Sequence, residues 1–514
     1  MKAIDEFYDA IVVGSGATGG WAAKELTESG LRVALLEAGP LFPVDVNALA
    51  TGTVDASQRQ PIQSLCYALT DHTAHLFVDD VDNPYSFPEG RPFHWIRSRQ
   101  VGGRLHVWGR VSPRMSDYEF KAATRDGVGE DWPIAYADLA PYYDRVERYL
   151  GVYGAAEHVP QMPDGIFLEP PPMSTGEREL RSAIHRRWKT RRLTSVRVAR
   201  RSPDATLAAA MHTGRLTLFA NSVASHVLAD SKTSRALGVA FVDGVTRRQH
   251  ELKGRVIVLC ASGIESTRLL LNSATHEHPG GLGNSSGVLG HYLMDHTYGI
   301  RFEGVAPQKS RGEIDGPSHG GYMPAFRNIT EDGVDFVRGY GVELQVTPPI
   351  ADRPRRLRNP WRSQGGFFWM TAFGEVLPTY ENHVSLDRTR TDAWGIPAAH
   401  IVCSYGDNEL LMARDQFACL KEMLDAAGFD IVTANRDLAP PGTSSHELGT
   451  ARMGADPGSS VLNRHNQSWG VKNLFITDGA CFTSGGFQNP TLTMMAITVR
   501  ACDYIVEKLK NREL

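Results

Sequence analysis

The stretch Tyr8-Asp-Ala-Ile-Val-Val13-Gly14-Ser-Gly16-Ala-Thr-Gly19 decides the fold of this chain. It runs from a short apolar, β-branched segment into a glycine-rich turn, and an Ala-rich helical stretch follows from Trp21 to Ser29. A second apolar segment, Val33-Ala-Leu-Leu36, then ends at Glu37. This order of strand, turn, helix and strand is the fingerprint of a dinucleotide-binding βαβ unit. We therefore predict an α/β fold.

Each glycine of the turn has its own expected task. Gly14 permits the tight turn, Gly16 lets the backbone approach a pyrophosphate, and Gly19 allows the helix to pack closely on the strand. Glu37 stands where a carboxylate accepts hydrogen bonds from the ribose hydroxyls of an adenosine. A glycine-rich turn in an ordinary α/β protein is the alternative, and the fingerprint alone does not separate FAD from NAD. The predicted binding residues of this unit are Gly14, Gly16, Ala17, Thr18, Gly19 and Glu37.

Composition describes an ordinary globular enzyme. The chain has 514 residues, which suffices for two or three domains, with 42% hydrophobic residues and a formal net charge of −4. It has no net basicity that would indicate a nucleic-acid partner. The Arg-rich run from Arg181 to Arg201 is interpreted as a solvated helix face and strand edge, with a role towards anionic ligands or partners as the alternative.

Neither metal centres nor membrane segments are predicted. Six cysteines are scattered without a Cys-x-x-Cys pair, which argues against disulfides and iron–sulfur clusters. His276-Glu-His278 is interpreted as a surface loop rather than a metal site. The start of the chain has no apolar signal region, and no apolar run approaches the length of a membrane span. We expect a cytoplasmic protein without membrane contact.

The middle of the chain divides into two kinds of segment. Residues 91–120 contain a Gly pair among mixed apolar and polar residues, which suits a loop passing close to a flat ligand. Residues 214–261 read as short strands, and the last one ends in Ala261-Ser-Gly263, a second turn into a helix whose N-terminus points towards the dinucleotide.

Residues 301–440 have a different pattern. Alternating strands such as Tyr340–Val346 and Gly366–Thr371 precede a helix from Asn408 to Ala427. We predict an antiparallel sheet with helices that forms the substrate side. The Gly-rich segment 310–321 is either a mobile loop over the site or a plain surface connection, and the sequence favours neither.

The segment near the C-terminus supplies the candidate chemistry. His446 lies in a Gly-rich loop, and Asn489-Pro490 precedes an apolar, helix-like run. Pro is favoured at the first helical position and Asn at the N-cap before it, so a helix is predicted to begin there. A helix N-terminus carries partial positive charge and free N–H groups that stabilise an anion. The loop and the helix start therefore resemble two halves of a redox site.

Seven motifs in one order resemble the glucose–methanol–choline (GMC) family of FAD oxidoreductases, over nearly the whole chain. They are Gly14-Ser-Gly-Ala-Thr-Gly19, Val101-Gly-Gly103, Ala261-Ser-Gly-Ile-Glu265, Gly290-His-Tyr-Leu-Met-Asp-His296, His446-x-x-Gly-Thr450, Asn473-Leu-Phe-Ile-Thr-Asp478-Gly and Asn489-Pro-Thr-Leu-Thr493. The resemblance implies a Rossmann-like FAD-binding domain interleaved with an antiparallel-sheet substrate domain, α+β overall. We assign residues 1–120, 196–300 and 441–514 to the first domain and 121–195 and 301–440 to the second, with 41–90 as a lid or insert.

Within this family, the His–Asn pairing followed by Pro-Thr-Leu-Thr is most similar to pyranose oxidases and to bacterial relatives that oxidise glycosides. The resemblance implies a sugar or glycoside substrate, oxidised at a secondary ring hydroxyl at C2 or C3, with O2 or a quinone-like compound as electron acceptor. Fungal pyranose oxidases attach FAD through a His directly before the Trp of the Val-Gly-Gly loop. Val107 holds that place here and His106 stands one residue earlier, so we expect non-covalent FAD.

The mechanism expected from these residues is alcohol oxidation. His446 is the predicted base, because a histidine pKa lies near neutrality. Asn489 is predicted to bind the alcohol oxygen and to orient the C–H bond towards flavin N5. The N–H groups of the helix opened by Pro490 and Thr491 would stabilise negative charge on the reduced flavin. His296 and His465 are expected to be structural.

The remaining assignments concern the adenine, the ribityl and pyrophosphate region, and the sugar pocket. Val223 is expected to meet the adenine through its backbone, and Asp478 to approach the ribityl or pyrophosphate region. Gln345 and the aromatic residues from Phe367 to Trp369 either line the sugar pocket or belong to the core. The further predicted cofactor-binding residues are Arg99, Gly102, Gly103, His106, Val107, Val223, Ala261, Asp478, Gly479, Asn489, Pro490 and Thr491.

Three other functions compete with sugar oxidation. One is a GMC enzyme that acts on a non-sugar alcohol, and another is a flavin-binding electron-transfer subunit without alcohol chemistry of its own. The third, an NAD-dependent dehydrogenase, predicts a colourless protein. The sequence leaves open whether C2 or C3 reacts, whether free sugars or O- or C-glycosides are preferred, and which oligomer forms.

Overall fold

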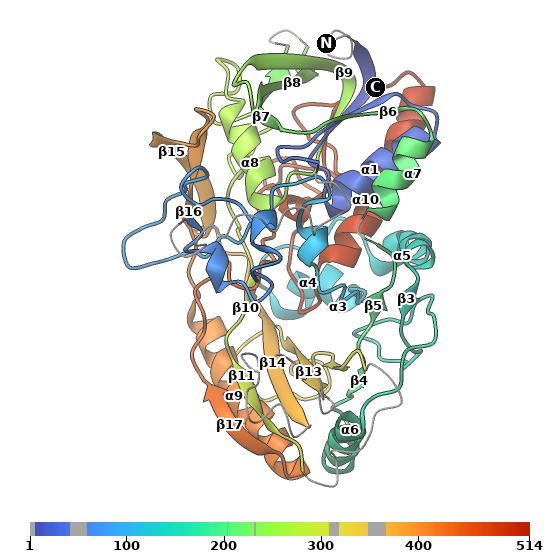
Figure 1. Cartoon of the computed structure of the whole chain (residues 1–514), viewed down its shortest axis with the longest axis vertical. Helices are drawn as coiled ribbons and strands as arrows, with labels where there is room; N and C mark the ends of the chain where they lie inside the picture. The colour runs from blue at the N-terminus through green and yellow to red at the C-terminus, as the bar shows by residue number, and fades with distance from the viewer. Residues whose placement is uncertain (1–5, 42–58, 203, 231–232, 308–317, 348–365) are drawn as a thin grey trace.

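The computed structural model describes residues 6–41, 59–202, 204–230, 233–307, 318–347 and 366–514. Two seven-stranded sheets lie one above the other along the long axis of the molecule, with both termini at the end of the upper sheet (Figure 1). Most of the predicted loop 310–321, and residues 42–58 of the predicted insert, lie outside the described residues. The predicted α/β class, with a Rossmann-like domain and an antiparallel sheet, is confirmed.

The first sheet is mainly parallel and carries the N-terminal fingerprint. Its strand order is β6-β2-β1-β9-β8-β7, and β18 also pairs with β9. The pairs β1–β2, β1–β9, β2–β6 and β9–β18 are parallel, whereas β7, β8 and β9 form an antiparallel meander. The strands are β1 (Phe7–Val13), β2 (Val33–Leu36), β6 (Leu216–Phe219), β7 (Ser222–Ala229), β8 (Ala236–Asp243), β9 (Gln249–Leu259) and β18 (Leu474–Ile476).

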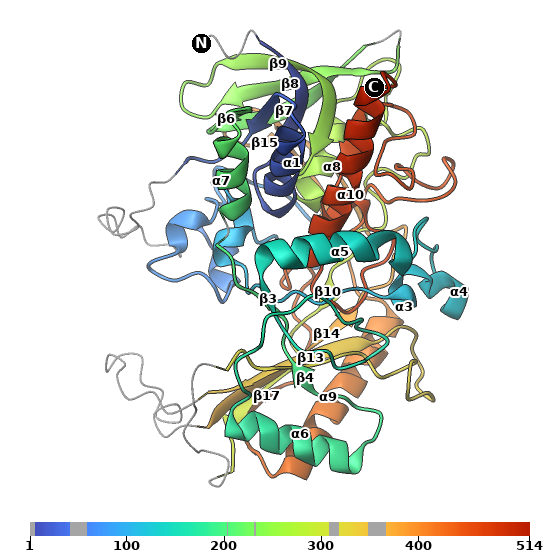
Figure 2. The same ribbon diagram turned by 90° about the vertical axis from the view of Figure 1, so that its right-hand side faces the viewer.

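Helices enclose this sheet and explain its apolar central strands. The helices α1 (Ala17–Glu28), α7 (Ala205–His212) and α10 (Thr491–Lys510) pack together on one face (Figure 2). All four residues of β2 and the last four of β1 are buried, as expected for parallel strands covered on both faces. The unbroken Val, Ile and Leu run that the sequence shows is the consequence of this double burial.

The second sheet is antiparallel, in the order β17-β11-β14-β13-β12-β4, with β10 beside β14. Alternate residues of its strands point to opposite faces. Val342, Leu344 and Phe368 enter a core with the helices α6 (Thr175–Arg187) and α9 (Asp407–Ala427), which lie below the sheet in Figure 2. The other face looks towards the first domain. The strands are β4 (Thr194–Ser195), β10 (His296–Thr297), β11 (Arg301–Val305), β12 (Gly321–Met323), β13 (Tyr340–Val346), β14 (Phe367–Glu375) and β17 (Asp430–Asn435).

Two segments pack differently from the predicted domain division. The helix α5 (Tyr136–Leu150) belongs to the predicted substrate range, but its buried face lies against α10 in the core of the first domain. The hairpin of β15 (His383–Thr391) and β16 (Pro397–Val402) packs on α8 (Gly263–Asn272) of the same domain. Both segments are therefore corrected to the nucleotide-binding half, because their apolar residues are buried there. None of the helices in the described ranges combines the length and apolar character that a membrane span needs.

Candidate active site

A cavity of about 940 Å³ lies between the two sheets. Val13, Leu36 and Cys260, at the carboxyl ends of the parallel strands β1, β2 and β9, line one side of it. Ligands of open α/β sheets bind at this edge, outside the carboxyl ends of the strands. The antiparallel sheet forms the opposite wall. One space thus joins a nucleotide-binding edge to a second, chemically different surface.

The glycine turn has the shape that a dinucleotide requires. A Cβ atom added at Gly14, where φ is +94°, would lie 2.4 Å from the carbonyl oxygen of Cys260, and one at Gly19 would lie 1.7 Å from that of Gly14. A Cβ added at Gly16 would meet no described atom within 4 Å. The turn is therefore tight against β9 and α1 but open towards the cavity. This geometry fits the pyrophosphate of FAD on the N-terminus of α1.

Glu37 and Arg99 provide charged groups beside the glycine turn. The Glu37 carboxylate accepts hydrogen bonds from Ser15 Oγ at 2.6 Å and from Gly39 N at 2.8 Å. Burial raises the pKa of Glu37, and these hydrogen bonds oppose the rise. Arg99 is paired with Glu265 (Nη2 to Oε1, 3.6 Å), while its buried Nη1 has no hydrogen-bond partner among the described residues. Both side chains line the cavity and are suited to the polar parts of a nucleotide.

Most of the predicted site residues meet at this one cavity. His106 does not, because its Nε2 lies 2.8 Å from the Val101 carbonyl oxygen. Gln345 does not either, because its amide donates to the Ser318 carbonyl at 3.2 Å. Gly19 and Gly102 also lie outside the lining. The predicted residues that line the cavity are Gly14, Gly16, Ala17, Thr18, Glu37, Arg99, Gly103, Val107, Val223, Ala261, Trp369, His446, Asp478, Gly479, Asn489, Pro490 and Thr491.

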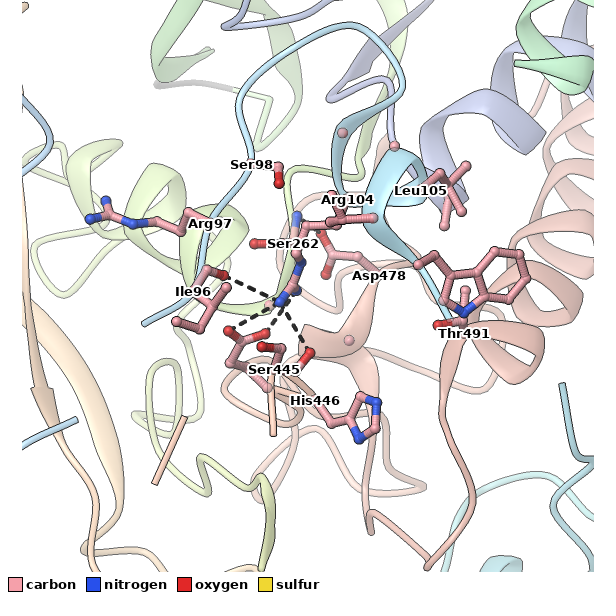
Figure 3. A pocket seen from close by; sticks show the side chains of 18 of the residues that line it. Ile96, Arg97, Ser98, Arg104, Leu105, Ser262, Ser445, His446, Asp478 and Thr491 are labelled. Carbon is pink, nitrogen blue, oxygen red and sulfur yellow. Dashed lines mark hydrogen bonds and ion pairs between the residues drawn. The ribbon is translucent and has the colours of Figure 1, made fainter. Parts of the chain in front are cut away.

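The loop that carries His446 is fixed by two charged groups, the buried Asp295 and the partly buried Arg104, which the sequence does not single out. The Asp295 carboxylate accepts hydrogen bonds from the backbone N–H groups of Gly442 (2.7 Å) and His446 (3.0 Å). Arg104 donates to the Ser445 carbonyl at 3.0 Å and pairs with Glu447 at 2.8 Å (Figure 3). Ser445 adopts φ +61°, a strained conformation for a non-glycine residue that surrounding contacts must hold. The imidazole of His446 is thereby placed rigidly beside the cavity.

His296, which the sequence predicts to be structural, contacts His446 directly. Its Nδ1 lies 2.8 Å from His446 Nδ1, and its Nε2 lies 2.9 Å from the Gly486 carbonyl oxygen. Because a carbonyl only accepts, His296 Nε2 carries the proton, and a neutral His296 then accepts at Nδ1. His446 must donate from Nδ1, so its Nε2 is free of hydrogen. This arrangement leaves Nε2 of His446 ready to take a proton from a ligand.

The surroundings keep both imidazoles neutral. Desolvation lowers the pKa of His446 well below its usual range, and His296 and Arg104 add to the effect. Desolvation also lowers the pKa of His296 to about 4. A base must be unprotonated before it can act, and the lowered pKa of His446 keeps its free-base form populated at neutral pH.

Asn489 stands directly before α10, with Pro490 as the N-cap residue and Thr491 as the first helical residue. The helix thus begins one residue later than the capping pattern predicts, and the Asn489 side chain is among the groups that line the cavity. Asp478 lies nearby at the end of β18, where it accepts hydrogen bonds from Ser262 N (3.0 Å) and Ala480 N (3.0 Å). Burial raises the pKa of Asp478 to about 6.

The opposite wall of the cavity is polar. Arg301, Glu303, Glu343 and Thr371 line it together with Trp369, all on one face of the second sheet. Arg301 Nε donates to Glu303 at 2.9 Å, and its guanidinium lies over the Trp369 ring, 5.1 Å from the centroid. From the sequence, only Gln345 and the aromatic residues from Phe367 to Trp369 are predicted for this wall. The period-2 alternation of β13 and β14 is the signal that would have placed Glu343 and Thr371 on the same face.

Known structures share this fold over its full length. The formate oxidase of Aspergillus oryzae superposes with a TM-score of 0.66 over 99% of both chains, at 14% sequence identity. Curated relatives are more similar in sequence. The 2-methyl-1,2-propanediol dehydrogenase of Mycolicibacterium austroafricanum is 29% identical, covering 98% of this chain and 96% of its own.

Two further relatives act on sugars according to their names. The fructose dehydrogenase large subunit of Gluconobacter japonicus is 26% identical, with 98% of both chains covered. The C-glycoside 3-oxidase of Arthrobacter globiformis is 25% identical, covering 98% of this chain and 96% of that protein.

Family models account for the segments that build the site. A model described as FAD binding domain matches residues 9–86, which include the glycine turn and Glu37. Two models described as GMC oxidoreductase match residues 180–298 and 378–498, and the second of these contains both His446 and Asn489. The chain belongs to the GMC oxidoreductase family.

Proposed function

We propose that this protein oxidises a secondary ring hydroxyl, at C3 or C2, of a pyranose sugar or glycoside to the corresponding keto sugar. The observation that carries the proposal is the polar wall formed by Arg301, Glu303, Glu343 and Thr371 opposite His446 and Asn489. A substrate with several hydroxyl groups needs many hydrogen-bonding partners, whereas a simple aliphatic alcohol needs few. Trp369 adds an aromatic surface of the kind on which the apolar faces of sugar rings pack.

In this proposal each residue around the reacting hydroxyl group has a defined role. Asn489 hydrogen-bonds the alcohol oxygen, and His446 Nε2 takes its proton while the carbinol carbon loses a hydride, which leaves a ketone. FAD, when bound, supplies the hydride acceptor at N5 and passes the electrons on to O2 or a quinone-like compound. His296 keeps accepting from Nδ1 of His446 after the proton arrives, so the charged imidazolium retains its hydrogen bond.

A second candidate is the oxidation of a small non-sugar diol. The 29% identity to 2-methyl-1,2-propanediol dehydrogenase favours it. An electron-transfer subunit without alcohol chemistry is disfavoured, because it would have no use for a histidine whose Nε2 is left free beside Asn489.

The test compares methyl β-D-glucopyranoside, an aryl C-glycoside and 1,2-propanediol as substrates of the purified holoenzyme. We expect kcat/KM to be at least about 100-fold higher for a pyranoside, because each additional well-made hydrogen bond contributes roughly 0.5–1.5 kcal/mol. Product analysis by NMR assigns the keto position to C2 or C3. A preference for 1,2-propanediol would replace the sugar proposal by the diol candidate.

We further infer that the FAD is held without a covalent bond through the Val101–Trp108 loop. Val107 has no nucleophilic atom, and the His106 ring is hydrogen-bonded to Val101 outside the cavity. Acid precipitation of the holoenzyme is therefore expected to release all of the flavin into the supernatant, as measured by its absorption spectrum. Yellow colour that remains in the washed pellet would contradict this inference.

A further inference from the structure

Glu343 is the residue of the polar wall whose partner on the substrate can be specified further. It lies in the middle of β13 and lines the cavity on the wall opposite the nucleotide edge. In the sheet register Glu343 is opposite Thr371 on β14, and Gly341 is opposite Phe373. The Phe373 ring in turn lies 6.2 Å from the His446 ring, centroid to centroid. Thr371, the partner of Glu343, is two residues from Phe373 on β14, so Glu343 lies on the same face of the sheet as a residue whose ring is near that of the base.

The Glu343 carboxyl group also reaches the other half of the alcohol-binding pair. The Asn489 side chain lies near enough to lower the pKa of this carboxyl group, and both residues line the same cavity. The Oε1 atom is buried and has no hydrogen-bond partner among the residues that the structure describes. No lysine or arginine of the described ranges forms an ion pair with Glu343.

A buried carboxylate oxygen without a partner is costly, since it has lost its hydrogen bonds to water and gained none. Burial accordingly raises the pKa of Glu343 to about 7, and the Asn489 side chain opposes the rise. A ligand that donates a hydrogen bond to Oε1 would remove this cost. Such a ligand group would lie next to the atom that Asn489 binds, because Asn489 and Glu343 line the same cavity and Asn489 is near enough to lower the pKa of Glu343.

We propose that Glu343 Oε1 accepts a hydrogen bond from a hydroxyl group on the carbon adjacent to the oxidised carbon, so that the enzyme requires a vicinal diol unit. Hydroxyl groups on neighbouring ring carbons are close enough to be held by adjacent protein groups. In this arrangement Asn489 and His446 bind the reacting oxygen, and Glu343 binds its neighbour. The inference rests on the proposed function and names the specificity residue of that same site.

The test measures anaerobic flavin reduction by methyl β-D-glucopyranoside and by its 2-deoxy, 3-deoxy and 4-deoxy analogues, in the wild-type holoenzyme. One analogue lacks the reacting hydroxyl and is inert. Of the others, one that lacks the hydroxyl bound by Glu343 should reduce the flavin about 10- to 100-fold less efficiently, the range expected for a hydrogen bond to a charged group. Equal efficiencies for the parent and every reactive analogue would overturn the inference.

The variant Glu343→Ala should remove this discrimination. It is expected to slow reduction by the parent glycoside to the level of the discriminated analogue, while reduction by that analogue stays the same. Glu251→Gln, a change to an exposed carboxylate on β9, is the control and should keep the wild-type ratio. Flavin content shows whether each variant is folded. If Glu343→Ala does not fold, the comparison of substrate analogues in the wild-type enzyme still tests the inference.

The outcomes also separate this inference from the proposed function. A wild-type flavin that no pyranoside reduces would contradict the function and the inference together. A flavin that pyranosides reduce without any vicinal requirement would overturn the inference alone. A strong preference for an analogue with an amino group in place of the vicinal hydroxyl would overturn the hydroxyl assignment and show that Glu343 recognises a cation.

Discussion

Replacing His446 by Ala is expected to leave FAD bound and to slow its reduction by substrate by about 10²- to 10⁴-fold, the contribution typical of a general base. His446 is the group whose Nε2 is left free of hydrogen beside the cavity, because its Nδ1 donates to His296. Its removal takes away the proton acceptor without touching the glycine turn. Anaerobic stopped-flow measurement of flavin absorbance gives the rate directly. Reduction at the wild-type rate would contradict the assignment.

His296 provides the matched comparison for this variant. His296→Ala should lower the rate of flavin reduction by about 10-fold with little change in substrate affinity, because His446 then loses the partner that fixes its tautomer. His296→Asn should restore part of the rate, since the Asn side-chain oxygen offers an acceptor near the position of Nδ1. An equal loss in both variants would indicate that His296 only fills space.

Replacing Gly16 by Val is expected to give a folded protein that contains no flavin. An added Cβ meets no described atom within 4 Å, so the turn has room at this position, but the valine side chain occupies the space in which the pyrophosphate would lie. The visible absorption spectrum measures flavin content, and circular dichroism measures folding. The variant should melt at the temperature of the wild-type apoprotein, below that of the holoenzyme, because a ligand that binds only the native state stabilises it.

Gly19→Ala is the contrasting change in the same turn. Its Cβ would lie 1.7 Å from the Gly14 carbonyl oxygen, so α1 and β1 must separate, at a cost of roughly 1–3 kcal/mol or more. This variant should lose stability as well as flavin. Full flavin content in Gly16→Val would contradict the placement of the cofactor on this turn.

Much of the fold could be predicted from the sequence because its signals are local. The β1 and β2 strands, the glycine spacing and Glu37 lie within one continuous segment, and the contacts at Gly14 and Gly19 show why a side chain is excluded there. The packing of α5 on α10, and of the β15–β16 hairpin on α8, joins residues far apart in the chain. The helix is amphipathic and the hairpin strands alternate between buried and exposed residues. The sequence therefore shows that each segment buries one face, but it does not show which surface covers that face.

The candidate site could likewise be predicted from the sequence only where its signals are local. His446 and Asn489 stand in recognisable local motifs, and both line the cavity. The contact of His296 with His446 spans 150 residues and depends on how two loops meet. Glu343 could not be preferred over Gln345 from the sequence, because both occupy the same face of β13 and only the folded structure places Glu343 among the residues that line the cavity.

The most direct test of the account is anaerobic mixing of the purified yellow holoenzyme with methyl β-D-glucopyranoside, followed by flavin absorbance and by NMR of the product. We expect complete bleaching of the flavin absorbance and one equivalent of a glycoside with a ketone at a secondary ring carbon. Flavin that stays oxidised in the presence of this and other pyranosides, while a non-sugar alcohol bleaches it, would contradict the account.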